Sequence, residues 1–489
     1  MKRYIIAIDE GTTSERVVLF DTITNKIIAH NGKKITQYYP NEAWVEQDAS
    51  EIWNNVKLSL EQVIKSNKLK IDEIYGIGIT NQRETTIAWN RLTGEPIHNA
   101  IVWQCRRTAA MCDSIPKQVK DKIKLKTGLV VDSYFSATKM RWILDHCKEA
   151  KSLAAKNQLC FGTIDSFLIY KLTDGKVHAT DTTNASRTML VDIRHPKQFD
   201  QELINYFKIP KSSLPTILSS SDNYGFAKTS IGEIPILSCI GDQQSSLVGQ
   251  GCFNKGSAKI TYGTGGFLLV NCGKTLPEDN INTINTVGYT INNDTTYAIE
   301  GSIFNVGSSL EYLKDTLNLF KSYADIDNIC KNYDSSSVFV LPAFTGIAAP
   351  YWSPTSRGVI AGLTLGTSKE QIVKSCVESF AYRVYDIASY LNSIKMPIKS
   401  INADGGVSRS NHLMQLQSDL LQVPVCKMTE SESTSLGAVF LCGLKAGAYA
   451  SLQEISTKIS YSTIYKPSVK SKAIKPKIDA WKNFVNKHI

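Results

Sequence analysis

A strand–turn–strand pattern occurs twice in this chain, once at its start and once just past its middle. In the first copy, apolar runs at residues 4–9 and 16–21 flank the turn Glu10-Gly11-Thr12-Thr13-Ser14. In the second copy, runs at 258–262 and 267–270 flank the turn Gly263-Thr264-Gly265-Gly266. Glycine and hydroxyl residues in a tight turn offer N–H and O–H donors to a phosphate, even without a P-loop sequence. The repeat therefore predicts two similar α/β domains, each with a phosphate-binding loop, that hold one nucleotide between them.

Chain length and glycine positions indicate where these domains divide. The 489 residues are enough for two large domains. We expect an N-terminal domain over residues 1–250, a C-terminal domain over 251–489, and a hinge at Gly249, Gly251 and Gly256.

The C-terminal half contains a third strand that ends in glycine. A short strand at 401–404 runs into Gly405 and Gly406, and a helix is expected over 411–420. A glycine pair lets the backbone approach a ligand closely, so this strand end is a further candidate for the nucleotide site.

Two more helices are predicted in this half. The first begins after a capping box of Ser368 and Gln371 and ends before Pro397. Trp481 and Phe484, three residues apart, predict the face by which a C-terminal helix docks on the core.

Polar and charged residues follow an apolar strand at 74–79 in the N-terminal half. They read Thr80-Asn81-Gln82-Arg83-Glu84-Thr85-Thr86, and Trp103 comes soon after. Ligands of open α/β sheets bind beyond the carboxyl ends of strands. Arg83 and Glu84 would set a donor fork beside an acceptor carboxylate, and the face of Trp103 would cover a carbon skeleton. The pattern predicts a pocket for a small polyhydroxyl compound, and the alternative is a surface ion pair that merely follows a strand.

Asp9 ends the first strand beside the first turn. Mg²⁺ is a hard cation that binds oxygen ligands together with nucleotide phosphates. Asp9 is therefore the candidate carboxylate ligand of a magnesium ion.

These segments resemble the carbohydrate-kinase family of the actin/hexokinase/Hsp70 ATPase superfamily, and within it the glycerol kinases. The resemblance extends nearly from end to end and is carried by Asp9 to Arg16, Gly78 to Trp89, Asn99 to Thr108, Tyr134 to Trp142, Asp181 to Leu190, Gly241 to Gln244, Tyr262 to Phe267, Pro342 to Trp352 and Asp404 to Asp419. It implies two similar ribonuclease-H-like, actin-like ATPase domains with an interdomain cleft. The implied reaction is transfer of the ATP γ-phosphoryl group to glycerol, with Mg²⁺, to give sn-glycerol 3-phosphate and ADP.

The resemblance also assigns roles to individual residues. Asp242 would be the general base, because phosphoryl transfer needs a positioned base, an in-line nucleophile and cations on the phosphates. The implied acceptor-binding residues are Arg83, Glu84, Trp103, Tyr134, Asp242, Gln243 and Phe267. The implied nucleotide-binding residues are Thr12, Thr13, Ser14, Arg16, Thr264, Gly307, Glu311, Gly406 and Ser410, and the implied metal ligands are Asp9 and Asp242.

Three positions depart from the family pattern. Glu10 stands where glutamine is common, and Glu311 and Ser410 stand where an amide often faces the nucleotide. These changes bear on nucleotide affinity and leave the acceptor residues intact. The alternatives are a related polyol or ketose kinase, which would differ in the acceptor segment, and a non-catalytic ATP-dependent switch of the same superfamily, which would need no acceptor pocket.

Composition excludes several other classes of protein. No apolar window reaches the ~18 residues of a membrane span, and no signal peptide precedes the first strand, so a cytoplasmic enzyme is expected. The 11 cysteines lack CxxC pairs and predict buried thiols without disulfides or a zinc site. The net charge of +10 is densest in a lysine-rich tail without a nucleic-acid motif, so no nucleic-acid partner is expected. Assembly as a homodimer or homotetramer is expected.

One motif match is set aside. Ser136-Ala137-Thr138-Lys139 fits the SxxK pattern of acyl-enzyme hydrolases, but no Ser-Asp-Asn or Lys-Thr-Gly companion is present. Acyl-enzyme chemistry is therefore not expected.

Overall fold

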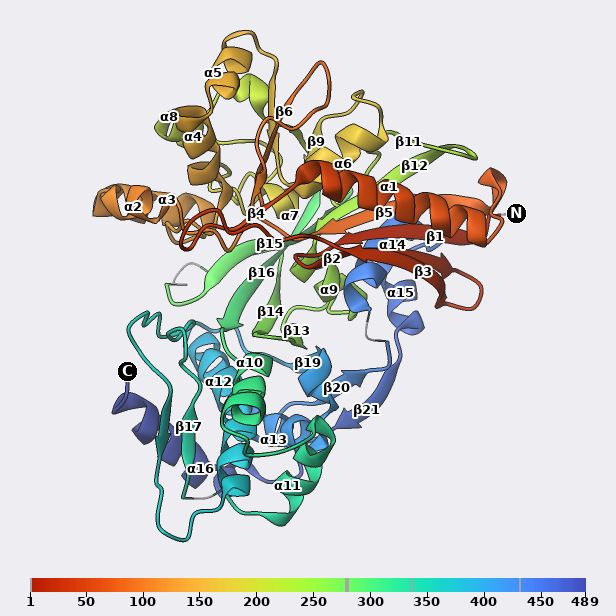
Figure 1. Cartoon of the computed structure of the whole chain (residues 1–489). Coiled ribbons are helices and arrows are strands. Elements are labelled where there is room, and N and C mark those ends of the chain that lie inside the picture. Colours follow the sequence, from red (N-terminus) through yellow and green to blue (C-terminus); the bar gives the residue numbers. More distant parts are fainter. Residues whose placement is uncertain (1, 278–280, 336, 431) are drawn as a thin grey trace. The chain divides into compact units, whose positions relative to one another are not determined.

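The computed structural model describes residues 2–277, 281–335, 337–430 and 432–489 (Figure 1). The chain divides into two compact units, and each contains more than one stretch of sequence. The first unit comprises Met1–Gly249, Asn285–Tyr297 and Glu432–Lys458. The second comprises Gln250–Ile284, Ala298–Ser431 and Ile459–Ile489. Two segments from the C-terminal half of the chain therefore belong to the first unit.

A six-stranded sheet forms the centre of the first unit. Its order is β11 (Phe226–Thr229), β12 (Gly232–Gly241), β5 (Ile74–Asn81), β1 (Tyr4–Glu10), β2 (Ser14–Asp21) and β3 (Lys26–Lys34). β1 is antiparallel to β2 and parallel to β5, and β5 is parallel to β12. The register pairs Asp9 with Thr80 and Asn81 with Gly241. The carboxyl ends of β1, β5 and β12 therefore meet at one edge of the sheet.

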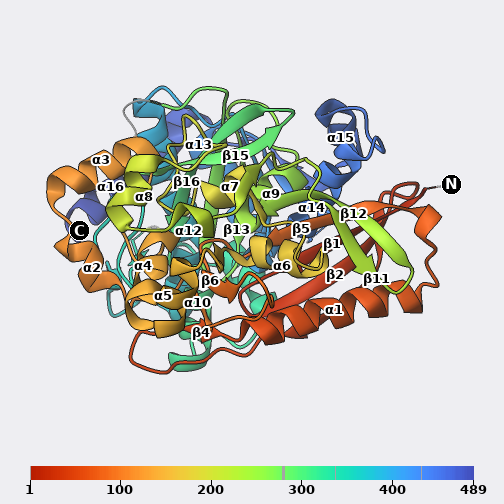
Figure 2. The ribbon, with the colours of Figure 1, turned by 90° about the horizontal axis from the view of Figure 1, so that it is seen from above.

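Helices cover both faces of this sheet, which explains its almost continuous apolar strands. On one face, Ile6 and Ile8 of β1 share a buried cluster with residues of α1 (Ala49–Ser66) and α6 (Ile164–Leu172). On the other face, α14 (Ser433–Lys445) packs on β1, β5 and β12, and α9 (Asp242–Gly249) packs on α14 (Figure 2). Gly78 permits this approach, because a Cβ there would lie 2.6 Å from the carbonyl oxygen of Ala438.

Smaller elements complete the first unit. Its other strands are β4 (Glu46–Gln47), β6 (Ile87–Asn90), β7 (Ala100–Ile101), β8 (Leu159–Gly162), β9 (Ala179–Asp181), β10 (Thr216–Leu218) and β15 (Ile284–Ile291). Its other helices are α2 (Ala109–Ser114), α3 (Lys117–Thr127), α4 (Ser136–His146), α5 (Lys148–Ala155), α7 (Thr182–Ala185), α8 (Gln201–Phe207) and α15 (Leu452–Lys458), with 3-10 turns at Ile71–Glu73 and Lys211–Ser213.

The second unit repeats the central arrangement of strands. Six strands have the order β16 (Asp294–Ile303), β14 (Gly266–Gly273), β13 (Ser257–Tyr262), β19 (Ser400–Asp404), β20 (Val425–Met428) and β21 (Tyr461–Tyr465), and they belong to a seven-stranded sheet whose edge strand is β15. β13 is antiparallel to β14 and parallel to β19, and β19 is parallel to β20. β13, β14, β19 and β20 thus correspond to β1, β2, β5 and β12. The predicted repeat is confirmed in topology.

The predicted helices of the second unit are also present. α12 (Lys369–Ser393) begins at a capping box of Ser368 and Gln371, and α13 (Asn411–Leu421) matches the predicted helix at 411–420. Trp481 of α16 (Ser471–Asn486) is fully buried and stacks on Tyr382 with ring centroids 5.0 Å apart. The remaining elements are α10 (Gly307–Glu311), a π-helix at Tyr312–Thr316, α11 (Ile326–Asn332), β17 (Phe339–Leu341), β18 (Val359–Ala361) and 3-10 turns at Tyr323–Asp325 and Gly406–Arg409.

The cysteines of this chain are not joined by disulfides. All 11 cysteines carry free thiols, and ten of them are buried. Across the described parts of the chain, no helix combines the length and the apolar character that a membrane crossing requires.

Candidate active site

Three predicted site residues lie at the shared edge of the first sheet. Asp9 is the last residue but one of β1, Arg83 follows β5, and Asp242 follows β12 as the first residue of α9. Because β1, β5 and β12 are parallel, their following residues gather beyond the same edge, as in other open α/β sheets.

Arg83 and Asp242 form an ion pair across this edge. The Arg83 Nε lies 3.2 Å from the Asp242 Oδ1, and its Nη1 donates to the Gln244 Oε1 at 3.2 Å. The arginine stem lies against Gly241, where a Cβ would be 2.7 Å from the Arg83 Cγ. The glycine before the predicted base is therefore required for the arginine to lie beside it.

Glu84 is buried in an unusual backbone conformation. Its φ is +60°, in the left-handed region, and it is 1% exposed. The Glu84 Oε1 accepts a hydrogen bond from the Arg187 Nε at 2.6 Å and lies 3.9 Å from the Arg83 Nε. Arg83 is 3% exposed, so the alternative of a surface ion pair is wrong. The two guanidinium groups compensate the cost of burying this carboxylate, and its oxygens can accept further hydrogen bonds.

Two aromatic rings lie beside these charges. Trp103 and Tyr134 pack edge to face with centroids 5.5 Å apart, and the Arg187 guanidinium lies 5.6 Å from the Tyr134 ring centroid. The Trp103 Nε1 donates to the Thr12 Oγ1 at 2.9 Å. That hydrogen bond connects the predicted acceptor residues to the first phosphate loop.

The first loop closes the β1–β2 hairpin. The Gly11 N–H donates to the Ser14 carbonyl at 3.0 Å, while the side chains of Thr13 and Ser14 are exposed. Arg16 forms an ion pair with Glu432, which precedes α14. The loop therefore presents free hydroxyl groups, whereas Arg16 already has a carboxylate partner.

Asp9 and Glu10 have perturbed acidities. Burial, with a smaller contribution from the negative charge of Asp242, raises the pKa of Asp9 to about 7, although the Ser435 hydroxyl donates to its Oδ2 at 2.9 Å. Burial raises the pKa of Glu10 well above its usual value, and its Oε1 accepts from the Gln82 Nε2 at 3.1 Å. Burial thus favours the neutral acid at Glu10, which has the shape of the glutamine that the family pattern favours.

Several residues of this cluster carry no local sequence signal. Arg187, Lys139 and Ser435 come from three separate segments, and each contacts a predicted site residue. Asn184 exchanges amide hydrogen bonds with Asn81 at 3.0 and 3.1 Å. The resemblance covers the segments that hold Arg187, Asn184 and Lys139, but only the fold brings them to the site.

In the second unit, Thr264 and Gly307 lie together. The Thr264 carbonyl accepts from the N–H groups of Val306 and Ser308 at 3.0 and 3.2 Å, and the Gly307 N–H donates to the Gly263 carbonyl at 3.0 Å. A Cβ on Gly307 would lie 2.7 Å from that carbonyl oxygen. The second phosphate loop is therefore tied by its backbone to the start of α10.

The other predicted residues of the second unit occupy different settings. Gly406 is exposed, with no atom within 4 Å of a Cβ placed there, and Glu311 is exposed on α10. Phe267 is half-buried on β14. Ser410 differs, because its hydroxyl donates to the Asp327 Oδ1 at 2.7 Å and caps α13. A nucleotide contact from that hydroxyl would have to replace a helix cap.

A buried cluster of Asp165, Asp181 and Cys239 has ligand atoms within 4.8 Å of one another. Both carboxyls already accept hydrogen bonds from hydroxyl groups. Thr180 donates to Asp165 at 2.6 Å, and Ser220 donates to Asp181 at 2.7 Å. Burial raises the pKa of both carboxyls. The cluster is thus a hydrogen-bonded part of the core.

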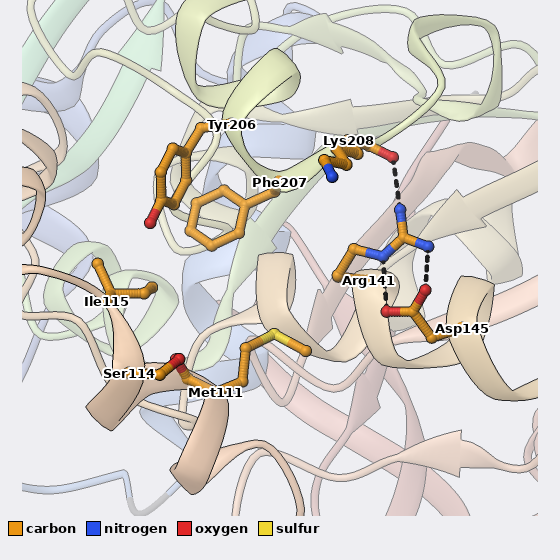
Figure 3. A pocket seen from close by; sticks show the side chains of 8 residues that line it. All are labelled: Met111, Ser114, Ile115, Arg141, Asp145, Tyr206, Phe207 and Lys208. Carbon is orange, nitrogen blue, oxygen red and sulfur yellow. Dashed lines mark hydrogen bonds and ion pairs between the residues drawn. The ribbon is translucent and has the colours of Figure 1, made fainter.

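A surface pocket of about 350 Å³ lies away from the predicted residues, between α2, α4 and α8 (Figure 3). Met111, Ile115 and Phe207 supply its apolar wall. The Arg141 Nε donates to Asp145 at 2.9 Å, and its Nη1 donates to the Lys208 carbonyl at 3.1 Å. The Arg141 guanidinium is therefore already hydrogen-bonded within the protein, which makes it a poor binding group for an anionic ligand.

Comparison with known proteins matches both halves of the chain to the same family. The N-terminal domain of the FGGY family of carbohydrate kinases matches residues 4–249, and the C-terminal domain of that family matches residues 258–446. A glycerol kinase from Alkaliphilus oremlandii is 44% identical over 493 residues, which cover 100% of this chain and 97% of the relative.

Solved structures agree with this result. The crystal structure of Plasmodium falciparum glycerol kinase with ADP has a TM-score of 0.93 at 33% identity, and the match covers 99% of this chain and 98% of that one. A ligand-bound xylulose kinase from Lactobacillus acidophilus has a TM-score of 0.89 at 24% identity, with the same coverage, and shows the fold alone. The predicted fold class, two α/β domains of the actin/hexokinase-like ATPase type, is confirmed.

Proposed function

Because this chain belongs to the FGGY family of carbohydrate kinases, we propose that it transfers the γ-phosphoryl group of ATP to a terminal hydroxyl of glycerol, yielding sn-glycerol 3-phosphate and ADP. The observation that carries the proposal is the cluster of the buried Arg83 and Glu84 with the partly exposed Asp242, near Trp103. Full-length similarity to glycerol kinases supports the choice of acceptor.

Acceptor recognition is assigned to charged and aromatic groups together. Arg83 supplies N–H donors and Glu84 supplies carboxylate acceptors, so adjacent hydroxyl groups can each find a partner. Trp103 and Tyr134 offer apolar surfaces to the carbon chain. Gln243 and Phe267 are the remaining proposed acceptor contacts. A three-carbon polyol needs this combination of paired donors and acceptors with little apolar area.

Asp242 is assigned the role of general base. Its Oδ1 accepts the Gln243 N–H at 2.7 Å, and its Oδ2 accepts the Gln243 Nε2 at 3.2 Å. These bonds and the Arg83 ion pair hold the carboxylate in one orientation at the start of α9. In that orientation the carboxylate would take the proton of the attacking hydroxyl as the oxygen bonds to phosphorus.

The phosphate groups are assigned to the two hairpin loops. Thr12, Thr13, Ser14 and Arg16 belong to the first loop, and Thr264 to the second. Gly307, Glu311, Gly406 and Ser410 are the proposed positions around the rest of the nucleotide.

Mg²⁺ fits the residues at the end of β1. Asp9 is a carboxylate whose pKa is raised to about 7 by burial, with a smaller rise from Asp242, so a bound cation would restore its charged form. We assign Asp9 and Asp242 as the metal-site residues. Bound magnesium would neutralise charge on the phosphate oxygens.

An acceptor panel tests the proposal directly. ADP release would be measured with MgATP and glycerol, dihydroxyacetone, erythritol, xylulose or no acceptor, and the product identified by phosphorus NMR. Release with glycerol and formation of sn-glycerol 3-phosphate are expected. Release only with another acceptor would replace glycerol by a related polyol or ketose, and ATP binding without any release would favour the non-catalytic switch.

The base assignment predicts the behaviour of Asp242→Asn. Loss of a general base lowers kcat roughly 10²–10⁴-fold, while the amide preserves side-chain shape. Stopped-flow phosphoryl transfer at saturating MgATP and glycerol would measure this. Asp174→Asn, which removes a surface partner of Lys228, is the control and should retain wild-type kcat. An Asp242→Asn enzyme with most of the wild-type rate would contradict the assignment.

Domain bounds, assembly and location are further proposals. We infer that the sequence divides into an N-terminal domain over 1–250 and a C-terminal domain over 251–489, of which Asn285–Tyr297 and Glu432–Lys458 pack within the first compact unit. We also infer a homodimer or homotetramer, and a cytoplasmic enzyme without a nucleic-acid partner. Light scattering after size exclusion would measure the assembly.

A further inference from the structure

Lys139 of α4 is fully buried and bonds to the main chain. Its Nζ donates to the Tyr134 carbonyl at 2.7 Å and to the Glu84 carbonyl at 3.2 Å. Burial lowers the pKa of Lys139 to about 8. An ammonium group held this way is expensive to bury, because carbonyl dipoles compensate its charge less fully than a carboxylate does.

The carbonyl of Glu84 receives donors from three residues. The Ser136 Oγ donates at 3.0 Å and the Thr86 Oγ1 at 3.1 Å, in addition to the Lys139 Nζ. Left-handed backbone is unfavourable for a residue other than glycine and persists where its surroundings enforce it. Three donors on one carbonyl supply that enforcement and fix the peptide that follows Glu84.

The two carbonyls that Lys139 joins belong to two residues proposed to bind the acceptor. Glu84 follows β5, and Tyr134 precedes α4. The orientation of the Glu84 peptide determines where its carboxylate lies relative to Arg187, 2.6 Å away. The position of the Tyr134 backbone determines where its ring meets Trp103. One side chain thus fixes both the polar and the aromatic side of the proposed pocket.

We propose that Lys139, assisted by Ser136, is a positioning residue that holds Glu84 and Tyr134 in the geometry needed to bind the polyol acceptor. This inference rests on the proposed function. The positioning role also accounts for the SxxK match, because both its serine and its lysine donate hydrogen bonds to the Glu84 carbonyl.

The test compares Michaelis constants for the two substrates in full-length enzyme. Lys139→Met keeps an unbranched side chain but removes both hydrogen bonds, and it should raise the glycerol KM at least tenfold while the ATP KM stays within twofold. Ser136→Ala should raise the glycerol KM by a smaller factor in the same direction. Lys126→Met is the control: it removes a half-buried lysine bound to Asp200 in the same unit and should leave both constants unchanged.

The outcomes separate the two proposals. A wild-type enzyme inactive on glycerol would contradict the proposed function. An active wild type, with Lys139→Met and Ser136→Ala at wild-type glycerol KM, would contradict the positioning role alone. Equal rises of both Michaelis constants would also contradict it, because they would indicate general loss of structure. If Lys139→Met does not fold, Ser136→Ala decides, and an unchanged glycerol KM in it overturns the role.

Discussion

At the scale of single residues, the proposed acceptor pocket is a set of balanced charges, of which Arg83, Glu84 and Arg187 are buried and Asp242 is partly exposed. Arg83 faces Asp242 and Glu84, and Arg187 faces Glu84. A buried ion is tolerated when its partners compensate the lost hydration. Removal of one partner leaves the other charge buried without compensation, which strongly destabilises the fold. The pocket can therefore present charged groups to a small polar molecule without any rearrangement of the core around it.

Asp9 should make stability depend on pH in the ligand-free protein. Its carboxyl ionises near 3.8 when unfolded and near pH 7 when folded, because burial raises the folded pKa. Between these values the unfolded chain loses a proton that the folded chain keeps, so the free energy of unfolding falls as pH rises. Asp9→Asn has no carboxyl to ionise at this position, so its free energy of unfolding should not fall in this way. The variant should be more stable than wild type at pH 8, by on the order of 2 kcal/mol.

Urea unfolding at pH 5, 6, 7 and 8, without nucleotide or metal, measures the difference in free energy of unfolding between Asp9→Asn and wild type. This difference should grow up to about pH 7 and then level off. A difference that is constant across the range would contradict the raised pKa. Activity with MgATP should fall in the same variant, since the proposed metal ligand is lost.

At the scale of helices and strands, α9 and α14 meet through glycine. A Cβ on Gly437 would lie 1.9 Å from the Ser245 carbonyl oxygen, and a Cβ on Gly249 would lie 1.9 Å from the Ser433 carbonyl oxygen. The two backbones therefore approach more closely than any side chain allows. Since α9 begins with Asp242, this contact also supports the position of the proposed base.

Gly437→Ala tests the close approach. The added methyl group should lower the free energy of unfolding by about 3 kcal/mol, the upper part of the range for an overpacked core. Gly366→Ala is the matched control, because the nearest atom to a Cβ there is 3.8 Å away. Denaturant midpoints of both variants would be compared with wild type, and equal midpoints for the two would contradict the packing argument.

Elements with a strong local pattern could be predicted from the sequence. The strands of both hairpins, the capped helix α12 and the helix α13 lie close to their predicted bounds, because apolar runs and caps are local signals. Arg83 and Glu84 were identified because they follow the end of an apolar strand, whereas Asp242 was assigned by the family resemblance. Lys139, Arg187 and Ser435 could not be singled out, because their roles depend on contacts with residues far away in the chain. The hinge at the glycines remains a prediction.

At the scale of the whole chain, the first unit depends on sequence from the second half. α14 covers one face of its sheet, and Phe440 of this helix packs edge to face against Phe20 of β2 with centroids 6.2 Å apart. A chain cut after Gly249 lacks α14. Its sheet would therefore expose an apolar face of Ile5, Ala7 and Val18, which the intact protein buries.

A fragment of residues 1–249 should consequently aggregate or unfold without cooperativity. Size-exclusion chromatography and near-ultraviolet circular dichroism would measure this, with the full chain as control. Co-expression of residues 250–489 should restore part of the soluble fragment, because that piece supplies α14. A monomeric 1–249 fragment with a cooperative unfolding transition would contradict the prediction.

The late position of α14 also affects how the protein is made. A ribosome adds roughly 5–20 residues per second, so about 10–40 s separate synthesis of Gly249 from synthesis of Lys458, where the first unit ends. During that interval the first sheet has emerged with one apolar face uncovered, and it is then a target for chaperones and for association with neighbouring nascent chains.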